Sequence, residues 1–226
     1  MDERLIGIGI YSIPEAARLT GVRSARISRW VKGYAYRVDD EQRTSPPVWT
    51  RQLADIDGSV SLGFLDLIEL RLIDAFRRHG VSWQTLKKAA DRAKSLFRTT
   101  HPFATQRFIT DGRAIFTELL DEDKSLLDVV GNQYAFKKVL APYLFGLQFR
   151  DGREVVKWWP LGDDRDVVID PQRGFGQPIV VNEGVPTKIL ANALRIQRSV
   201  AVVADWYEVS ERAVRDAAEF EKGLAA

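Results

Sequence analysis

The chain has 226 residues, with 33 Lys and Arg against 31 Asp and Glu, so a formal net charge of +2 excludes strong attraction to anions by net charge alone. Apolar residues make up 45% of the chain, including 11 Phe and 6 Trp, which excludes a disordered protein. Cysteine is absent, which excludes disulfides, thiolate chemistry and cysteine-based metal sites. We find no apolar run of the length that a signal peptide or a membrane span requires, and therefore expect a cytoplasmic protein.

The stretch YSIPEAARLTGVRSARISRWVKGYAYR, Tyr11–Arg37, is strongly basic: no acidic residue follows Glu15 until Asp39. Ser12 is a typical N-cap, and the proline two positions later suits a first helical turn, which predicts a helix over Pro14–Leu19. Thr20-Gly21 ends this helix, and a second helix is expected from about Arg23 or Ser24 to Val31. The pattern predicts a helix–turn–helix.

The second helix has an apolar and a basic face. Ile27, Trp30 and Val31 follow i, i+3, i+4 spacing and are expected to face the first helix. The opposite face combines long cations with small residues, which lets a helix lie deep in the DNA major groove. A solvated helical hairpin is the alternative. The predicted DNA-binding residues are Arg18, Arg23, Ser24, Ala25, Arg26, Ser28, Arg29, Lys32, Tyr34, Tyr36, Arg37 and Arg43.

A β-hairpin wing is expected after the second helix. YAYRV (34–38) and PPVWTRQL (46–53) have the composition of two short strands, with the polar segment 39–45 as the loop between them. Its expected DNA contacts are Tyr34, Tyr36, Arg43 and Arg51. The stretch from Ile10 to Leu53 resembles the DNA-binding head of MerR-type proteins, and the resemblance implies binding to a double-stranded DNA operator. The chain departs from the metal- and drug-sensing members, since it has no cysteine effector site and no long solitary coiled-coil helix.

The middle of the chain predicts helices and hairpins. Two amphipathic helices are expected over Phe64–Arg78 and Ser82–Phe97, separated by His79-Gly80. Their expected buried stripes are Leu65, Ile68, Leu72, Ile73 and Phe76 in the first helix, and Leu86, Ala89, Ala90 and Leu96 in the second. The Asp-Gly pairs in QRFITDGRAIFTEL (106–119) and FGLQFRDGREVVKWWPL (145–161) each predict a β-hairpin, with a helix over 131–145 between them.

No pattern in the chain indicates catalysis or a metal site. His79 and His101, the two histidines, have no second ligand at metal-binding spacing, and we expect capping or solvated roles for them. The acidic clusters at 121–123 and 163–166 lack the glycine and the spacing of a calcium loop, so solvated turns are expected. A nuclease that uses these acids is thus disfavoured. We predict a protein that is not an enzyme and has no catalytic residue, metal or cofactor.

The C-terminal part is expected to contain two strands followed by helices. Val200, Val203, Ala204, Tyr207, Val209 and Val214 form an apolar set in another helix–turn–helix geometry, with Ser210 as the N-cap of the last helix. Its expected exposed residues mix both charges, as Glu208, Glu211, Arg212, Arg215, Asp216 and Glu219. Balanced charge does not favour phosphate binding, so a protein-binding or dimerising role is expected.

The segment from Val168 to Glu221, with the motifs IDP, FGQPIV, GVPTKIL and VADWYEVSERAVRDA, resembles the antitoxin module encoded beside PIN-like nucleases. Together with the MerR-like head and the segment HPFATQRFITDGR, nearly the whole chain resembles a VapB-type antitoxin. The resemblance implies an autoregulatory DNA-binding protein that neutralises a PIN-like ribonuclease toxin. A homodimer is also expected, because a single recognition helix is too small for tight specific binding. Candidate cations for the toxin contact are Arg173, Lys188, Arg195, Arg198, Arg212 and Arg215.

The predicted fold class is α+β and mainly helical, with an N-terminal winged helix–turn–helix, a central helical pair with β-hairpins and a small C-terminal helical module. We predict four parts: the DNA-binding head (1–60), a helical pair (61–100), a mixed hairpin region (101–160) and the interaction module (161–226). The alternative function is a MerR-like transcriptional regulator whose C-terminal part senses a small molecule, with the aromatic hairpin Phe145–Trp159 lining its pocket.

Overall fold

The computed structural model describes residues 5–38, 41–47, 49–119, 133–151 and 153–225. These residues form two compact units. The N-terminal unit contains residues 11–144 and 151–154, and the C-terminal unit contains residues up to 10, 145–150 and 155 onward. None of the helices in the described ranges has the combined length and apolarity needed to cross a membrane. The four-part division expected from the sequence stays a prediction.

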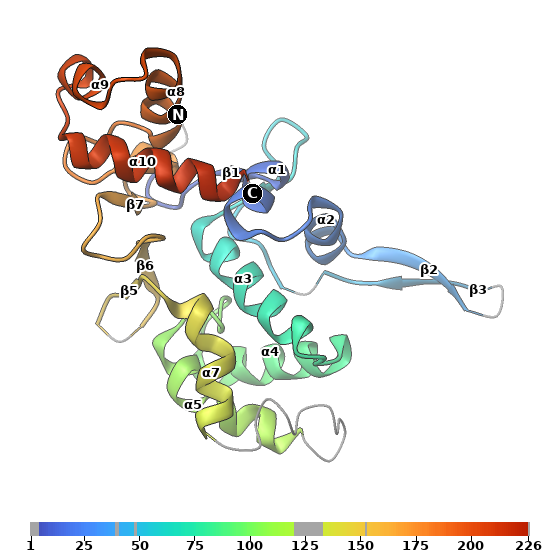
Figure 1. Ribbon diagram of the computed structural model, residues 1–226. Coiled ribbons are helices and arrows are strands. Elements are labelled where there is room, and N and C mark those ends of the chain that lie inside the picture. Colours follow the sequence, from blue (N-terminus) through green and yellow to red (C-terminus); the bar gives the residue numbers. More distant parts are fainter. Residues whose placement is uncertain (1–4, 39–40, 48, 120–132, 152, 226) are drawn as a thin grey trace. The chain divides into compact units, whose positions relative to one another are not determined.

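The N-terminal unit begins with the predicted helix–turn–helix and wing (Figure 1). Its elements are β1 (Tyr11–Ser12), α1 (Ile13–Thr20), α2 (Ser24–Lys32), β2 (Tyr34–Val38), β3 (Glu41–Ser45), β4 (Ser61–Leu62), α3 (Phe64–Arg78), α4 (Trp83–Phe97), α5 (Gln106–Glu118) and α7 (Gln133–Leu144). β1 pairs antiparallel with β4, which joins the start of α1 to the start of α3. β2 and β3 form a hairpin that projects beyond α2.

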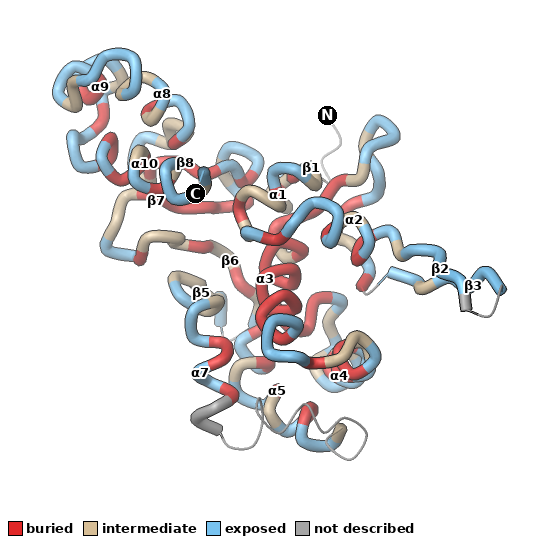
Figure 2. Tube along the Cα trace, turned by 45° about the vertical axis from the view of Figure 1, so that its right-hand side comes forward, coloured by how far each residue is buried: buried red, intermediate tan, exposed pale blue. Residues whose placement is uncertain are grey.

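α3 is the central helix of this unit. Figure 2 shows it buried along most of its length, whereas the wing is exposed. The prediction of one buried stripe was wrong, because neighbours on several sides also bury polar residues such as Asp66, Glu69 and Asp74. Leu65, expected in the buried stripe of α3, is only half-buried, and Leu96, expected in that of α4, is 48% exposed.

A cluster of phenylalanines forms the core beside α3. Phe76 of α3 meets Phe116 of α5 with ring centroids 4.7 Å apart, and Phe103 and Phe108 pack edge-on at 4.6 Å. The cluster overturns the predicted Asp-Gly hairpin at 106–119, which is helix α5 capped by the Thr105 side chain. The helical spacing of Phe108, Ile115 and Phe116 buries all three, and this outweighs the turn preference of Asp-Gly.

The C-terminal unit is a four-stranded antiparallel sheet with three helices. The strands follow the order β5 (Leu147–Phe149), β6 (Val155–Trp158), β7 (Val167–Ile169) and β8 (Pro178–Val180), and a short 3-10 turn, η3 (Gly174–Gly176), precedes β8. The β5–β6 pair confirms the hairpin predicted there. The helices α8 (Thr187–Gln197), α9 (Val200–Tyr207) and α10 (Glu211–Leu224) follow.

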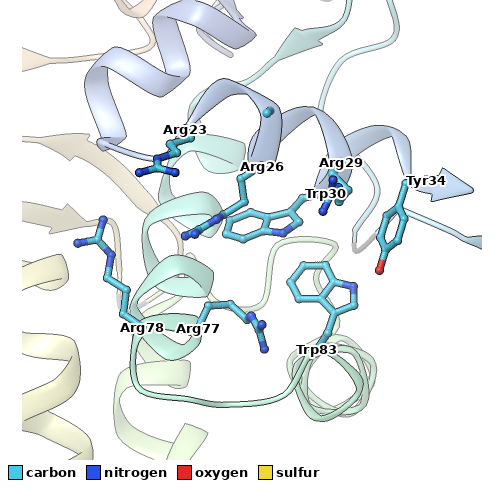
Figure 3. A pocket seen from close by; sticks show the side chains of 9 residues that line it. Arg23, Arg26, Arg29, Trp30, Tyr34, Arg77, Arg78 and Trp83 are labelled. Atoms are coloured by element: carbon cyan, nitrogen blue, oxygen red, sulfur yellow. The ribbon is translucent and has the colours of Figure 1, made fainter. Parts of the chain in front are cut away.

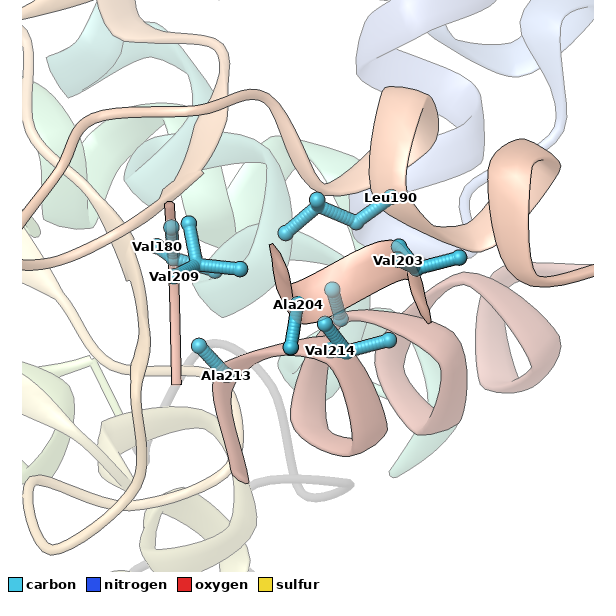
Figure 4. Packing of buried hydrophobic residues seen from close by; sticks show 8 residues of the cluster. Val180, Leu190, Val203, Ala204, Val209, Ala213 and Val214 are labelled. Atoms are coloured by element: carbon cyan, nitrogen blue, oxygen red, sulfur yellow. The ribbon is translucent and has the colours of Figure 1, made fainter. Parts of the chain in front are cut away.

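Figure 4 shows the core of these helices. Leu190 of α8, Val203 and Ala204 of α9, and Val214 of α10 converge beside Val180 of β8. The Ser210 side chain accepts a hydrogen bond from the backbone N–H of Ala213, which confirms the predicted N-cap of α10. The fold as a whole is mainly helical with small antiparallel sheets, and the predicted α+β class with an N-terminal helix–turn–helix is confirmed.

Candidate nucleic-acid interface

Local sequence signals build the helix–turn–helix. The Ser12 side chain accepts a hydrogen bond from the backbone N–H of Glu15, and Glu15 Oε2 accepts one from the Ser12 backbone at 2.8 Å, forming a capping box. Gly21 ends α1 in the left-handed conformation, with φ of 71°. Val22 is buried in the turn. These contacts fix where α2 begins and how it is aimed.

The phase of α2 is the predicted one. Ile27, Trp30 and Val31 are buried, and the Trp30 ring stacks on Trp83 of α4 with centroids 5.4 Å apart. Ala25, Arg29 and Lys32, like Ser24 at the helix start, are exposed, and Ser28 is half-buried. Within the described ranges, neither Arg29 nor Lys32 pairs with a carboxylate, so their charges face solvent uncompensated.

Arg26 has a different role from its neighbours. Its Nη1 lies 2.7 Å from Oδ1 of Asp74, a side chain only 2% exposed on α3, and Arg78 Nε donates to Oδ2 of the same carboxylate at 2.5 Å. Asp74 therefore ties α2 to α3 and neutralises part of this flank. Direct DNA contact by Arg26, as predicted from the helix phase, would compete with this ion pair.

The start of α2 and the end of α3 form an arginine-rich hollow (Figure 3) of about 440 Å³. Figure 3 shows Arg23, Arg26 and Arg78 at one side and Trp83 and Tyr34 at the other. The sequence analysis missed Arg77 and Arg78, because their nearness to α2 depends on tertiary packing. The lining residues are Arg23, Ala25, Arg26, Arg29, Trp30, Tyr34, Arg77, Arg78 and Trp83.

The wing differs from the predicted one in its second strand. β3 is the polar segment Glu41–Ser45, expected as loop, and the described residues of PPVWTRQL, 46–47 and 49–53, are not in a strand. Two prolines there cannot donate ladder hydrogen bonds, and Trp49 is instead buried, donating to Asp66 Oδ1 at 2.7 Å. Because the hairpin is solvated, its strands need no apolar alternation.

Aromatic and basic side chains line this wing. The guanidinium of Arg29 lies 5.2 Å from the Tyr34 ring, and the Tyr34 and Tyr36 rings are 5.8 Å apart. Tyr36 is paired in register with Arg43, and Arg37 with Gln42. An exposed ion pair of 3.4 Å joins Arg43 to Glu41, an arrangement that contributes little in salt.

Three further arginines, Arg18, Arg23 and Arg51, were predicted to contact DNA. Arg23 is the exposed N-cap of α2, and Arg18 is half-buried in the last turn of α1. The prediction that Arg51 lies in the wing was wrong, and its contact with DNA stays a prediction. Its Nη1 instead donates to the Ser61 carbonyl at 3.2 Å and lies 2.9 Å from Asp55, in a segment outside the hairpin.

A network of buried hydrogen bonds is centred on Asp66 and Glu69 of α3, which packs against the helix–turn–helix. Asp66, fully buried, accepts from Trp49 Nε1, from the backbone of Gly63 at 2.8 Å, and lies 3.1 Å from Nε2 of His101. The backbone N–H of Phe103 donates to Glu69 at 2.9 Å. His101 therefore has a structural role that the sequence did not indicate, and the expectation of a capping or solvated residue was wrong for it.

Burial changes the titration of this network. Burial raises the pKa of Glu69 to about 7, although the charge of His101 and the N–H groups of Phe103 and Ala104 act against it. For His101, burial disfavours the imidazolium, but the hydrogen bond to Asp66 and the charges of Glu69 and Asp66 outweigh this effect and raise the pKa.

The other residues considered for metals have local roles. His79 is the C-cap of α3, with Nδ1 2.9 Å from the Ala75 carbonyl, which confirms a capping role. The cluster 121–123 lies outside the described residues. In the second acidic cluster, Asp166 lies 3.8 Å from Arg212. Among described residues, no three His, Asp or Glu side chains gather as a group that could hold a metal.

The predicted partner-binding cations fall into two groups. Arg173 donates to the carbonyl of Val181, Arg212 donates to the carbonyl of Asp164, and Arg215 pairs with Glu211 of its own helix. The first two contacts join separate segments of the C-terminal unit, whereas the exposed Arg215–Glu211 pair lies within α10. Lys188, Arg195 and Arg198 are exposed on α8 or at its C-cap, and none pairs with a carboxylate in the described part of the chain.

Asp216 of α10 is buried, and its predicted exposure was wrong. Arg165 Nη2 lies 2.7 Å from its Oδ1, and the Asp166 backbone donates to its Oδ2. Burial opposes ionisation of Asp216, but these hydrogen bonds outweigh it and lower the pKa of the carboxyl. The contact joins α10 to the loop before β7.

Two parts of the chain match known protein families. Residues 9–90 match a family described as "putative DNA-binding HTH domain", and residues 167–220 match a "protein of unknown function (DUF433)". The first match spans the helix–turn–helix, the wing, α3 and the start of α4. The second spans the sheet edge and most of the three helices of the C-terminal unit. The chain is thus similar to a DNA-binding helix–turn–helix family in its N-terminal part and to the DUF433 family in its C-terminal part.

The chain is similar to a curated protein named "putative antitoxin VapB45" from Mycobacterium tuberculosis, with 29% identity over 225 residues that cover 93% of this chain and 92% of the relative. It is also similar to the crystal structure of Rv2018 from the same organism, with 27% identity, a TM-score of 0.70, and coverage of 94% of this chain and 98% of the other. These findings confirm the resemblance to a VapB-type antitoxin. The resemblance of the head to MerR-type proteins stays a prediction.

Proposed function

We propose that this protein is the antitoxin of a toxin–antitoxin pair, which binds its own operator and neutralises a PIN-like ribonuclease toxin by protein contact. The observation that carries the DNA-binding half is the exposed face of α2, where Arg29 and Lys32 flank the small Ala25 without carboxylate partners in the described ranges. The similarity to a protein named as an antitoxin supports the second half.

The DNA-binding role follows from the chemistry of this face. Small side chains let α2 approach the floor of the major groove, where Arg29 can donate to the O6 and N7 atoms of guanine. The arginines at the end of α3 supply cations for the neighbouring DNA phosphates. The wing places Tyr36, Arg37 and Arg43 beside the sugar–phosphate backbone of the DNA. Repression of the operon then results from occupancy of the operator.

Neutralisation is assigned to the C-terminal unit. PIN-like nucleases hold a metal with carboxylates, and an inhibitor can place cations or a bulky side chain over such an acidic site. Among the six candidate cations, Lys188, Arg195 and Arg198 are exposed and have no carboxylate partner in the described ranges, so they are available for this contact. This division leaves α2 available for DNA.

The test is co-expression with the protein encoded by the neighbouring reading frame. We expect that protein alone to stop growth and cleave RNA, and the full chain to restore growth and co-purify with it. In parallel, the full chain is titrated against DNA from its own upstream region and against a scrambled duplex at two salt concentrations. Failure to bind the neighbouring protein and to rescue growth would refute the antitoxin function. Equal binding to both duplexes would refute sequence-specific binding to the operator.

The C-terminal unit offers one observation for the alternative, a regulator that senses a small molecule. The β5–β6 hairpin lines a surface hollow of about 540 Å³, with Phe145, Gln148, Trp159 and Asp163 among its residues. The Gln148 side-chain oxygen already accepts from Trp159 Nε1 at 3.2 Å, which reduces the polar groups left for a ligand. A metabolite that changes operator affinity in wild type, and loses this effect in Trp159→Ala, would establish the sensor.

A further inference from the structure

The outer face of α8 and α9 carries four large apolar side chains in water. Ile189 and Ile196 are seven residues apart on α8, so they lie on the same side two turns apart, and Val202 and Trp206 are one turn apart on α9. Ile196 is 68% exposed and Trp206 is 59% exposed. Burying such side chains is favourable, and an exposed Trp is the residue type most enriched at the centres of protein interfaces.

These side chains have no role in the core of their own unit. The inward sides of the two helices are Leu190, Val203 and Ala204, which pack against α10. Ile196 and Val202 lie close in the sequence, on either side of the short connection Arg198–Ser199. We call the set Ile189, Ile196, Val202 and Trp206 the α8–α9 face.

Cations border the α8–α9 face. Lys188 and Arg195 are exposed on α8 beside Ile189 and Ile196, and Arg198 caps the helix in the left-handed conformation. Asp205 and Glu208 are the exposed acids on α9. These three cations against two acids leave the face with a net positive charge, which a partner bearing carboxylates matches better than a second copy of the same face does. A partner with an apolar pocket bordered by carboxylates is complementary to this face.

We propose that the α8–α9 face is the surface on which the toxin docks, with Trp206 and Ile196 inserted into an apolar pocket and Arg195 and Lys188 paired with toxin carboxylates. The assignment rests on the proposed function and names the surface that performs it. It selects three of the six candidate cations, since Arg173 and Arg212 donate to carbonyls of their own unit and Arg215 pairs with Glu211.

The experiment measures binding of the full-length chain to the protein encoded by the neighbouring reading frame, by calorimetric titration. Trp206→Ala and Arg195→Glu are the test variants. Phe175→Ala is the control for an exposed aromatic residue, because Phe175 is 53% exposed on η3, and Lys222→Glu is the control for charge reversal, because Lys222 is exposed on α10. Circular dichroism and melting temperature confirm that each variant folds.

We expect Trp206→Ala to raise the Kd at least about 30-fold and Arg195→Glu about 10-fold. Both controls should stay within about threefold, and operator affinity should not change in any variant. Wild-type binding that is unaffected by Trp206→Ala and Arg195→Glu would overturn the docking surface while leaving the antitoxin function intact. No wild-type binding and no rescue of growth would overturn the antitoxin function itself.

The remaining possible occupant of the α8–α9 face is a second copy of the chain, and a self-association assay tests for it. Sedimentation of the same variants reports whether the α8–α9 face joins two copies of the chain. If Trp206→Ala converts a dimer to a monomer without changing toxin affinity, the face is a contact between copies and the proposal is wrong. If the oligomeric state stays unchanged while toxin affinity falls, the result supports the proposal.

Discussion

Arginines that are neighbours along α2 differ in what they contact. Arg26 shares the buried Asp74 with Arg78, so its guanidinium helps to fix the helix. Arg29 has no carboxylate among the described residues and lies against the Tyr34 ring, which leaves its donors available to a base. Arg23, at the exposed N-cap of α2, faces the arginine-rich hollow. Sequence spacing placed these residues on one surface, and the contacts separate their roles.

The first prediction concerns Arg29. Arg29→Ala should weaken operator binding by about 1–3 kcal/mol and relax the preference at one base position, because a bidentate guanine contact is lost. Arg23→Ala should weaken binding to every sequence alike, since it removes a phosphate contact. Fluorescence anisotropy on operator and scrambled duplexes distinguishes them. Equal losses on both duplexes for both variants would refute the assignment.

The second prediction concerns the pH dependence of stability. Glu69 has a folded pKa of about 7 against an ordinary value of 4.5, so the folded state keeps the extra proton. Its contribution is fully present below about pH 4.5 and is lost as the pH rises through 7. The raised pKa of His101 acts in the same direction. We expect the free energy of unfolding to fall by about 1–3 kcal/mol between pH 5 and pH 8 through Glu69.

Denaturant unfolding of Glu69→Gln across this pH range checks the second prediction. The amide still accepts from the backbone N–H of Phe103 but does not titrate, so the pH slope should become shallower. Glu118→Gln is the matched control, because Glu118 is exposed and should leave the slope unchanged. An unchanged slope in Glu69→Gln would show that another group is responsible.

At the scale of elements, α3 is the support on which the helix–turn–helix rests. Its Asp66 holds the segment after the wing through Trp49 Nε1 and the Gln52 backbone N–H, and its Asp74 holds α2. The aim of α2 therefore depends on buried polar contacts as well as on the packing of Trp30 against Trp83. Breaking such contacts leaves buried groups unsatisfied, which costs about 1–3 kcal/mol for each group.

The third prediction concerns the joint between α2 and the wing. Gly33 has φ of 74° and ψ of −176°, a conformation nearly restricted to glycine, and a Cβ there would lie 2.3 Å from the Ser45 carbonyl oxygen. Gly33→Ala should displace the wing and weaken operator binding at least about 10-fold. Gly21→Ala is the control, because Gly21 has φ of 71° but open space around its Cβ.

Both variants strain the backbone, so both should lower the melting temperature. Only Gly33→Ala should lose more DNA affinity than its stability explains, as measured by anisotropy well below the melting temperature. The same loss of affinity in both variants would mean that the wing does not contribute to DNA binding.

At the scale of the whole molecule, the chain supplies one recognition helix in its N-terminal unit, which is little surface for tight specific binding at physiological salt. We therefore propose a homodimer on a pseudo-palindromic operator, with half-sites about 34 Å apart or as the dimer dictates.

The fourth prediction is that sedimentation at micromolar concentration gives a dimer and that two chains bind each operator. A duplex with one half-site deleted should bind much more weakly, because only one α2 can then engage its bases. A monomer that binds the operator with one-to-one stoichiometry would refute this arrangement.

Sequence alone determined the features that depend on neighbours in the chain. The capping box of Ser12 and Glu15, the turn at Gly21 and the buried phase of Ile27, Trp30 and Val31 follow from caps, glycine and helical spacing. The N-cap of α10 and its apolar core were predictable for the same reason. Capping, turn and helix-spacing rules predict structure where the interacting residues are neighbours in the sequence.

Only the tertiary structure decided what depends on distant partners. The Asp-Gly pair at 111–112 lies in a helix because the phenylalanine cluster buries Phe108 and Phe116. Residues 49–53 are not a strand, because Trp49 donates a hydrogen bond to Asp66 instead. The roles of Arg26, Arg77 and Arg78 depend on packing between α2 and the end of α3. The hydrogen bond from Arg26 to Asp74 joins residues that are 48 positions apart in the sequence. The free energy gained by burying an aromatic ring or pairing a buried carboxylate exceeds a local turn preference. The local sequence does not show which distant residue will be the partner.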